Sequence, residues 1–428
     1  MGEQRDLLRL ATAGSVDDGK STLVGRLLYD TKSVLADQLD AVHRASVDKG
    51  LSTPDLSLLV DGLRSEREQG ITIDVAYRYF ATPARSFVLA DTPGHVQYTR
   101  NTVTGASTAQ LAILLVDARK GVIEQTRRHA AVLALLAVPR LVLAVNKIDL
   151  VDYDEDVFAA IAAEFEAHAR ALGYPAGSVR SIPVSALVGD NVVERSANID
   201  WYSGPTLLEH LETVPVEPDP HDAPFRFPVQ YVIRTNTAEF PDYRGYAGQV
   251  AAGTVRPGDD VVVLPSGRRS AVTAIDTPDG PLSEAVAGQS VTLLLADDID
   301  ITRGDLIAPA AAAPAVADEF DATLAWLGDK PLRPGARVLL KHGTRTVQAL
   351  VGGLGARFDE QTLSIVDSPE SLELNEIGRV SLRTAEPLPL DDYAQVPRTG
   401  AFLVIDPADG STLAAGLVGA GLPGLVPA

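Results

Sequence analysis

The sequence predicts an α/β domain followed by two antiparallel β-barrels. Short apolar runs alternate with amphipathic segments through the first half of the chain, which is typical of a parallel sheet covered by helices. A proline-rich stretch over 214–228 ends that alternation, and short β-rich runs separated by turn residues follow it. The 428 residues suffice for two or three domains of roughly 150 residues each. We therefore draw the domains at 1–216, 217–309 and 318–428.

The first domain contains five apolar runs that we expect to form its strands: Leu7–Ala11, Phe87–Ala90, Ala112–Val116, Leu141–Val145 and Ser181–Val184. Between the last two runs, Phe158, Ile161 and Phe165 recur at helical spacing. This spacing predicts an amphipathic helix over Asp154–Leu172.

The second half contains two β-rich blocks. In the first block we expect strands at Pro228–Arg234, Ala247–Val255, Asp259–Leu264, Ala271–Asp276 and Ser290–Leu295. In the second block we expect them at Ala322–Trp326, Ala336–Leu340, Thr346–Val351, Arg379–Leu382 and Phe402–Ile405. The alanine- and proline-rich tract Ala308–Val316 separates the blocks and is interpreted as a linker. Closely spaced short strands with turns between them favour small barrels.

The composition of the chain argues against several classes of function. Its 37 basic and 57 acidic side chains give a formal net charge of −20, which is the wrong sign for a protein that binds nucleic acid or an anionic membrane surface. The absence of cysteine excludes disulfides, thiolate metal sites and cysteine nucleophiles. No signal peptide is evident, and Pro139 and Arg140 interrupt the most apolar stretch, 130–145. We expect a soluble cytoplasmic protein with no nucleic-acid or membrane partner.

The strongest chemical signal is a phosphate-binding loop directly after the first predicted strand. It consists of Gly14, Ser15, Val16, Asp17, Asp18, Gly19, Lys20 and Ser21, followed by Thr22, and it fits the pattern G-x-x-x-x-G-K-[ST]. Backbone N–H groups of such a loop wrap the phosphates, and the following helix adds positive potential. The Lys20 side chain then reaches the β- and γ-phosphates, and the Ser21 hydroxyl binds Mg²⁺. A chance glycine-rich turn would not place Lys and Ser in this register.

A second motif, Asp91-Thr-Pro-Gly94-His95, follows the predicted strand Phe87–Ala90. At the end of that strand the Asp91 carboxylate can reach the same Mg²⁺ ion, and the Gly94 N–H can sense the γ-phosphate.

Two further motifs point to guanine as the base. Asn146-Lys147-Ile-Asp149 ends the strand Leu141–Val145, and a carboxylate there can accept both N1–H and N2–H of guanine, which adenine does not offer. After the next strand, Ser185, Ala186 and Leu187 can place a backbone N–H near the guanine oxygen.

Together the four motifs resemble the GTPase superfamily. Arg67-Glu-Gln-Gly-Ile-Thr-Ile73 is similar to switch I of its translation-factor-like class. That resemblance implies that Thr72 closes on Mg²⁺ and the γ-phosphate and that His95 orients the attacking water. Thr72 is also compatible with an ordinary strand residue, and His95 with a capping or packing histidine.

Longer stretches resemble the large subunit of GTP-dependent heterodimeric sulfate adenylyltransferase. They cover 28–32, 59–63, 66–80, 97–101, 125–129, 204–210, 227–231, 243–248, 341–346 and 374–379, so the resemblance extends over essentially the whole chain. Val96 and Thr102 depart from the family pattern, in which an acidic residue and a methionine are expected.

The resemblance implies a GTPase subunit of a nucleotidyltransferase complex, with GTP and Mg²⁺ as cofactors. It would hydrolyse GTP and couple that energy to the first step of sulfate assimilation on a separate catalytic ATP-sulfurylase small subunit, in a heterodimer or a higher assembly of it. That subunit makes adenylyl sulfate and pyrophosphate from ATP and sulfate. No second phosphate-binding loop follows residue 230, so no fused adenylyl-sulfate kinase domain is expected.

Two other classes of function have the same domain order. One is an elongation-factor-like GTPase that carries aminoacyl-tRNA, and the other is a free-standing GTPase switch with no coupled reaction. The barrels themselves are compatible with inert spacers as well as with a partner surface. Composition does not separate these alternatives, and only the family resemblance favours sulfate activation.

Overall fold

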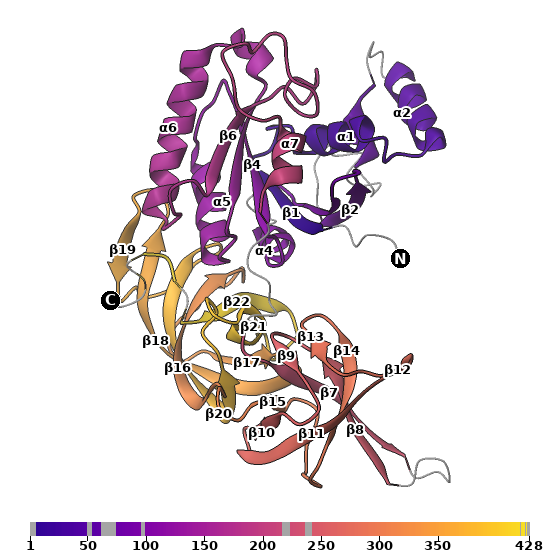
Figure 1. Ribbon diagram of the computed structural model, residues 1–428. Coiled ribbons are helices and arrows are strands. Elements are labelled where there is room, and N and C mark those ends of the chain that lie inside the picture. Colours follow the sequence, from indigo (N-terminus) through magenta and orange to yellow (C-terminus); the bar gives the residue numbers. More distant parts are fainter. Residues whose placement is uncertain are drawn as a thin grey trace. The chain divides into compact units, whose positions relative to one another are not determined.

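The computed structural model describes residues 6–48, 54–60, 74–95, 99–215, 223–235, 242–419, 421–423 and 425. The chain divides into two compact units, Met1–Glu217 with Glu360–Leu363, and Pro218–Asp359 with Ser364–Ala428 (Figure 1). Within the described residues, no helix combines the length and the apolar character needed to cross a membrane.

The first unit is built on a six-stranded sheet in the order β2-β3-β1-β4-β5-β6. In chain order its strands are β1 Leu7–Gly14, β2 Ala76–Ala81, β3 Ser86–Asp91, β4 Leu111–Asp117, β5 Leu141–Asn146 and β6 Val179–Pro183. All neighbours are parallel except β2, which runs antiparallel to β3. The five predicted strands are confirmed. The central strands β4 and β5 are buried along their whole length, as their uninterrupted apolar sequences require.

The sequence analysis missed β2, because it is an edge strand that buries little apolar surface. Tyr77 and Tyr79 are exposed on one face of it, whereas Phe80 is buried and stacks on Phe87 with 4.5 Å between the ring centroids. A strand of this kind lacks the continuous apolar run by which the other strands were recognised.

Helices pack on the sheet of the first unit (Figure 1). They are α1 Lys20–Asp30, α4 Thr99–Ala106, α5 Glu124–Leu135, α6 Glu155–Ala171 and α7 Leu207–Thr213. A further helix, α2 Ala36–Asp48, lies against the 3₁₀ turn η1 Leu56–Leu59, and a second 3₁₀ turn, η3, spans Ile148–Val151. Leu23 and Leu27 of α1 and Leu207 and Leu211 of α7 are fully buried in one core with residues of β1, β3 and β4.

The helix predicted over Asp154–Leu172 is confirmed as α6, with those two residues as its caps. The Asp154 carboxylate accepts hydrogen bonds from the backbone N–H groups of residues 156 and 157 at 2.8 and 3.1 Å. Such N-caps satisfy donors that have no partner within the helix. Of the three residues that predicted the helix, Ile161 and Phe165 are buried, while Phe158 packs against Trp201 at 5.4 Å between ring centroids.

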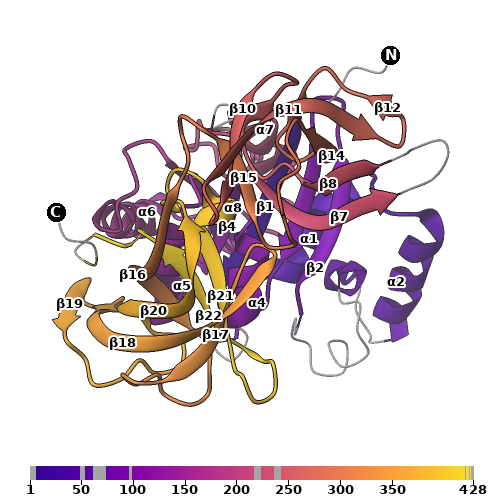
Figure 2. The ribbon, with the colours of Figure 1, turned by 90° about the horizontal axis from the view of Figure 1, so that it is seen from below.

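The second unit contains two antiparallel barrels. The first comprises β7 Phe227–Thr235, β8 Tyr243–Gln249, β9 Thr254–Val255, β10 Asp260–Leu264, β11 Arg268–Thr277, β12 Gly280–Pro281, β13 Ala285–Val286, β14 Ser290–Leu295 and β15 Leu306–Pro309. The second comprises β16 Ala315–Trp326, β17 Arg337–His342, β18 Arg345–Asp359, β19 Ser364–Asp367, β20 Ile377–Leu390, α8 Pro397–Gly400, β21 Ala401–Ile405 and β22 Thr412–Val418. Pairing of β10 with β11 closes the first barrel and pairing of β17 with β18 closes the second, whose strands curve around its core in Figure 2.

Two features of the barrels differ from the sequence prediction. The run Ala247–Val255 forms two strands because Gly253, at φ +70°, turns the chain, and a side chain there would overlap the backbone of Phe225. The tract Ala308–Val316 is strand at both ends and a connection only in its middle: Ala308 is buried in β15 opposite Val262, and β16 begins at residue 315. Only 310–314 connects the two barrels.

A buried ion pair joins the barrels. The guanidinium of Arg226, which precedes β7, donates through Nε and a terminal nitrogen to the two oxygens of Asp391, each at 2.8 Å. The Thr399 hydroxyl donates to the same carboxylate at 2.6 Å, and His342 Nε2 lies 2.7 Å from the Thr399 carbonyl. The Thr344 hydroxyl donates to a carbonyl of β7 at 2.9 Å. The buried Arg226 guanidinium and the Asp391 carboxylate therefore both have hydrogen-bond partners.

Removing one member of this pair should destabilise the second unit strongly. Arg226→Ala leaves the Asp391 carboxylate buried without its cation, and such a loss costs about 3–5 kcal/mol. Urea unfolding of the full chain, followed by a probe in the barrels, measures the change. Arg256→Ala is the matched control, because Arg256 pairs with Glu284 at 2.6 Å on the surface of the same unit, where a pair contributes about 0–1 kcal/mol. Equal losses in the two variants would contradict the assignment.

Candidate nucleotide-binding site

The predicted phosphate-binding loop connects β1 to α1. The strand ends at Gly14 and the helix begins at Lys20, so the loop lies at the carboxyl end of the sheet. Gly19 has φ +92°, and a Cβ there would lie 2.5 Å from the Asn146 side-chain nitrogen. A larger residue would therefore separate the loop from the strand that carries the predicted base-reading motif.

Two side chains of the loop brace it from inside. The Lys20 ammonium donates to the carbonyls of Gly14 and Ser15 at 2.9 and 2.8 Å, and the Asp18 carboxylate accepts the Ser15 N–H at 2.7 Å. Both side chains are nearly inaccessible to solvent. Burial lowers the pKa of Lys20, although the nearby carboxylates Asp91, Asp18 and Asp17 oppose the shift. Burial also raises the pKa of Asp18.

The second motif lies directly against this loop. The Thr12 hydroxyl donates to one oxygen of Asp91 at 2.7 Å, and the Thr92 hydroxyl donates to the Thr12 carbonyl at 2.6 Å. A Cβ on Gly94 would lie 2.5 Å from the Gly14 carbonyl oxygen and would overlap the Lys20 ammonium. Only glycine fits at that position, and the structure therefore brings Asp91, Gly94 and Lys20 together.

The other residues singled out in the sequence around this motif differ in their exposure to solvent. His95 is exposed at the end of the Asp91–His95 segment. Thr72 and Val96 lie outside the described residues. Thr102, the other departure from the family pattern, is buried, and its hydroxyl donates to the Pro93 carbonyl at 3.3 Å.

The amide of Asn146 connects the phosphate-binding loop to the third and fourth motifs. It donates to the Asp18 carbonyl at 2.7 Å and accepts the Ala186 N–H at 2.9 Å. Lys147 has φ +61° and donates to the Asp17 carbonyl, and Asp149 follows in η3. The four motifs thus meet at the carboxyl edge of the sheet.

The loop that follows β6 is held from two sides. Ser185 is buried, and its carbonyl accepts the Gly189 N–H at 2.7 Å. Arg26 of α1 donates through Nε to the Ala186 carbonyl at 3.2 Å. Leu187 is 61% exposed, so it borders the site without belonging to the core.

Several residues of the site were not predicted from the sequence. Thr12 and Arg26 carry no motif signal. Gln125 and His129 lie within a stretch that matches the family, but nothing in the sequence placed them here. The Gln125 amide nitrogen lies 3.1 Å from His129 Nε2 and 3.5 Å from the Gly94 carbonyl, so the pair lies behind the Asp91–His95 segment.

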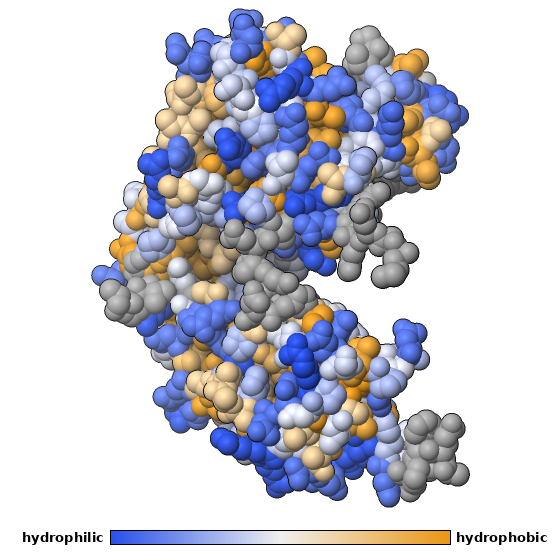
Figure 3. Space-filling view, viewed as in Figure 1, coloured by the Kyte–Doolittle hydropathy of each residue, from blue (hydrophilic) through white to orange (hydrophobic). Residues whose placement is uncertain are grey.

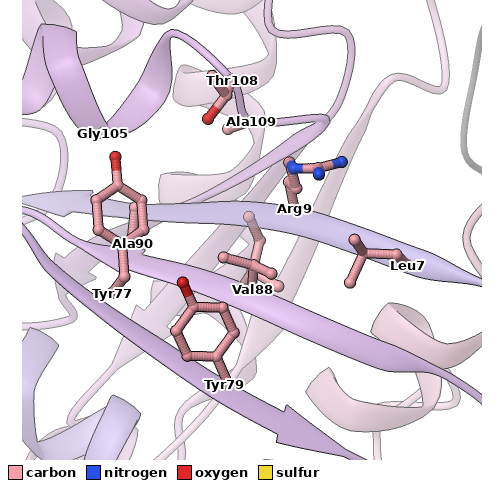
Figure 4. A pocket seen from close by; sticks show the side chains of 10 residues that line it. Leu7, Arg9, Tyr77, Tyr79, Val88, Ala90, Gly105, Thr108 and Ala109 are labelled. Atoms are coloured by element: carbon pink, nitrogen blue, oxygen red, sulfur yellow. The ribbon is translucent and has the colours of Figure 1, made fainter. Parts of the chain in front are cut away.

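A separate hollow of about 410 Å³ lies on the sheet of the first unit. Its lining includes Leu7, Arg9, Tyr77, Tyr79 and Val88, whose side chains are seen together in Figure 4. None of the residues of the four motifs lines it. On the face seen in Figure 3, hydrophilic and hydrophobic residues are interspersed.

Family models match three consecutive parts of the chain. The Elongation factor Tu GTP binding domain matches residues 5–216, Elongation factor Tu domain 2 matches 246–308, and the GTP-eEF1A C-terminal domain-like model matches 319–419. Together with the sheet and the two barrels, these matches confirm the predicted fold class.

Comparison with curated proteins identifies a narrower family. The chain is 50% identical, over 97% of its length and 86% of the relative's, to sulfate adenylyltransferase subunit 1 of Salmonella typhi. The chain belongs to the sulfate adenylyltransferase subunit 1 family. It is also 57% identical, over 96% of its length, to the bifunctional enzyme CysN/CysC of Mycobacterium tuberculosis, and 51% identical, over 97%, to the bifunctional enzyme NodQ of a Rhizobium species. It spans 67% and 64% of those two relatives.

Among solved structures, the chain resembles a crystal structure of sup35 complexed with GMPPNP, at 25% identity, 97% and 94% coverage of the two chains, and a TM-score of 0.43. Membership of the subunit 1 family, together with the GTP binding domain, makes the chain an enzyme subunit with a GTPase domain.

The buried histidine behind the site should make the first unit sensitive to acid. Burial lowers the pKa of His129 to about 3 from an ordinary 6.5, and the cations Lys20 and Arg128 add to the shift. Between these two values the unfolded chain binds more protons at this position than the folded chain does. The free energy of unfolding therefore falls as the pH falls through that window, by up to about 1.4 kcal/mol per pH unit.

Urea unfolding at pH 7 and pH 5 measures this contribution. We expect His129→Gln to lose less stability over that interval than the parent chain does. His43→Gln is the control, because His43 is exposed on α2. An identical pH dependence in the parent and in His129→Gln would contradict the assignment.

Proposed function

We propose that this chain is the GTPase subunit of a sulfate adenylyltransferase. In this proposal it hydrolyses GTP and couples that reaction to the formation of adenylyl sulfate and pyrophosphate on a separate catalytic subunit. The observation that carries the proposal is its 50% identity to sulfate adenylyltransferase subunit 1 over 97% of the chain. The convergence of the phosphate, metal and base motifs at one edge of the sheet supports the GTPase part of it.

The residues present fit a magnesium nucleotide. The Ser21 hydroxyl and the Asp91 carboxylate are hard oxygen ligands of the kind Mg²⁺ prefers, and Asp91 is one of the charges that act on Lys20. We assign Thr72 as a further ligand from the family resemblance. Bound Mg²⁺ would neutralise charge between the β- and γ-phosphates. In the proposal Lys20 contributes a fixed positive charge at the same phosphates.

The hydrolytic step is assigned to His95. It directly follows Gly94, whose backbone is held against the phosphate-binding loop, so a histidine there can orient a water toward the γ-phosphate. The loop residues Ser15, Val16 and Thr22 serve, in this proposal, to bind the nucleotide through backbone and side-chain contacts.

Coupling to a partner has a physical requirement. The anhydride between sulfate and AMP is harder to form than the ATP anhydride that it replaces, so adenylation alone should yield little product. GTP hydrolysis raises that yield only if the partner subunit interacts differently with the GTP and GDP states. We therefore infer that Thr72, the Asp91–His95 segment and the barrels face the catalytic subunit.

Guanine selection should depend on Asp149. Asp149→Asn replaces an acceptor of two N–H bonds by an amide that also donates, so guanine is left poorly paired at a cost of about 1–3 kcal/mol. Xanthine nucleotides, which present an acceptor at that position, should gain affinity. Competition between GTP and XTP for the variant measures the change. The control is Asp152→Asn, which makes the same replacement at a nearby carboxylate. Unchanged preference for GTP in Asp149→Asn would contradict the assignment.

The coupled reaction tests the function itself. The chain is reconstituted with the ATP-sulfurylase subunit, and pyrophosphate and GDP are measured together. GTP should raise the yield of pyrophosphate from ATP and sulfate, whereas a non-hydrolysable GTP analogue should not sustain it. His95→Ala should slow GTP hydrolysis by roughly 10²–10⁴ and lower the GTP-dependent yield with it.

Two results would contradict the proposal. One is adenylation that ignores GTP while the two subunits are demonstrably bound, which leaves a free-standing switch. The other is GTP-dependent retention of aminoacyl-tRNA in a filter-binding assay, which identifies a carrier.

A further inference from the structure

Lys147, next to the proposed base-reading residues, is held from two sides. Its ammonium donates to the Asp17 carbonyl of the phosphate-binding loop and lies 3.0 Å from Oδ2 of Asp117. Asp117 is the last residue of β4 and pairs in register with Asn146, the last residue of β5. The register of the sheet therefore places this carboxylate beside the lysine, and the Asp117 side chain is completely buried.

Arg119 holds the same carboxylate from the other side. Its backbone N–H and its Nε each donate to Oδ1 of Asp117 at 3.0 Å, and a terminal guanidinium nitrogen donates to Oδ2 at 2.6 Å. Burial alone would raise the pKa of Asp117, but the hydrogen bonds from Arg119 and Lys147 outweigh it and hold that pKa well below its usual range. The carboxylate is therefore ionised at neutral pH, and the three side chains form one ion triad.

The loop that the triad holds needs outside support. Lys147 has a left-handed backbone at φ +61°, which costs a non-glycine residue conformational energy and persists only where surrounding contacts offset that cost. Asn146, which precedes this residue, is fixed by its own bonds to Asp18 and Ala186, so a movement of Lys147 displaces mainly Asp149, the residue assigned to the base, two positions further on. The contacts that hold the Lys147 side chain are those to Asp17 and Asp117.

We propose that Arg119 is a positioning residue for the guanine nucleotide, which acts through Asp117 and Lys147 to hold the 146–149 loop and to slow nucleotide release. The inference rests on the proposed function, since it requires a guanine nucleotide in this site. It goes beyond the four motifs, because Arg119 belongs to none of them. The Arg119 side chain is 48% exposed, so replacing it removes its contacts to Asp117 without leaving a cavity in the core.

The position of the triad determines which nucleotides should be affected. In the described part of the chain, its contacts run to the base-reading loop and to the Asp17 carbonyl of the phosphate-binding loop, and none runs to the Asp91–His95 segment. Loss of Arg119 should therefore speed the release of GDP and GTP by the same factor, whereas loss of a contact to the γ-phosphate would affect GTP alone. For the same reason the KM for GTP should rise more than kcat falls.

The experiment follows release of fluorescent mant-GDP and mant-GTP from the full chain after addition of excess unlabelled nucleotide. Arg119→Ala should release both about tenfold faster, as expected when charge-assisted hydrogen bonds at a half-exposed site are lost. Arg119→Lys should fall between the parent and the alanine variant, because an ammonium keeps the charge but cannot make the forked contact. Arg127→Ala is the matched control: Arg127 pairs with Glu164 at 2.8 Å on the same unit, and its loss should leave release unaltered.

Three outcomes would overturn the inference. They are unaltered release from Arg119→Ala, accelerated release of GTP alone, and equal acceleration in Arg127→Ala, which would point to general loosening of the unit. Failure of the parent chain to bind either mant nucleotide would overturn the proposed function instead.

Discussion

The nucleotide site depends on one buried amide, the side chain of Asn146. It donates to the backbone of the phosphate-binding loop at Asp18 and accepts from the backbone of the next loop at Ala186. An apolar residue of the same size would leave two buried backbone groups without partners, each at a cost of about 1–3 kcal/mol. Because both ends of the amide are used, its orientation is fixed. The groups assigned to the phosphates and to the base are therefore positioned by the same side chain and cannot shift independently.

The net charge of the chain says little about this site. The −20 total disfavours extended contact with a polyanion, yet Lys20 and Lys147 both point into the loop that is predicted to hold phosphates. Each cation is paired locally, Lys20 with the carbonyls of its own loop and Lys147 with Asp117. Burial makes these charges costly unless they are paired, and pairing fixes their positions before a ligand arrives. Local arrangement, not total charge, decides what the site can bind.

The sequence predicts the parts of the fold and of the site that follow from local pattern. Buried parallel strands are continuous apolar runs, and motifs at their carboxyl ends meet at one edge because the strands are parallel. It does not predict β2, whose tyrosines face outward, or the strand pairing of Ala308. Asp117, Arg119 and His129 escaped notice for a different reason. Asp117 pairs with Arg119 and His129 with Gln125 over short distances in the sequence, but the contacts that bring these pairs to the site run to Lys147 and to the Gly94 carbonyl, which are far away in the chain.

Several residues of the barrel stretches that match the family make internal contacts. Within the matching stretch Tyr243–Gly248, the Tyr246 ring is buried and its hydroxyl donates to the Ile299 carbonyl at 3.1 Å. Within Lys341–Thr346, Thr344 bonds to β7 and His342 contacts the joint between the barrels. These contacts give Tyr246, His342 and Thr344 a role in packing the barrels. The buried ion pair of Arg226 and Asp391 nevertheless bears on function. Two barrels joined through a buried, fully partnered charge pair resist bending at the joint, so a displacement imposed on one barrel moves the other, whereas freely jointed spacers would absorb it.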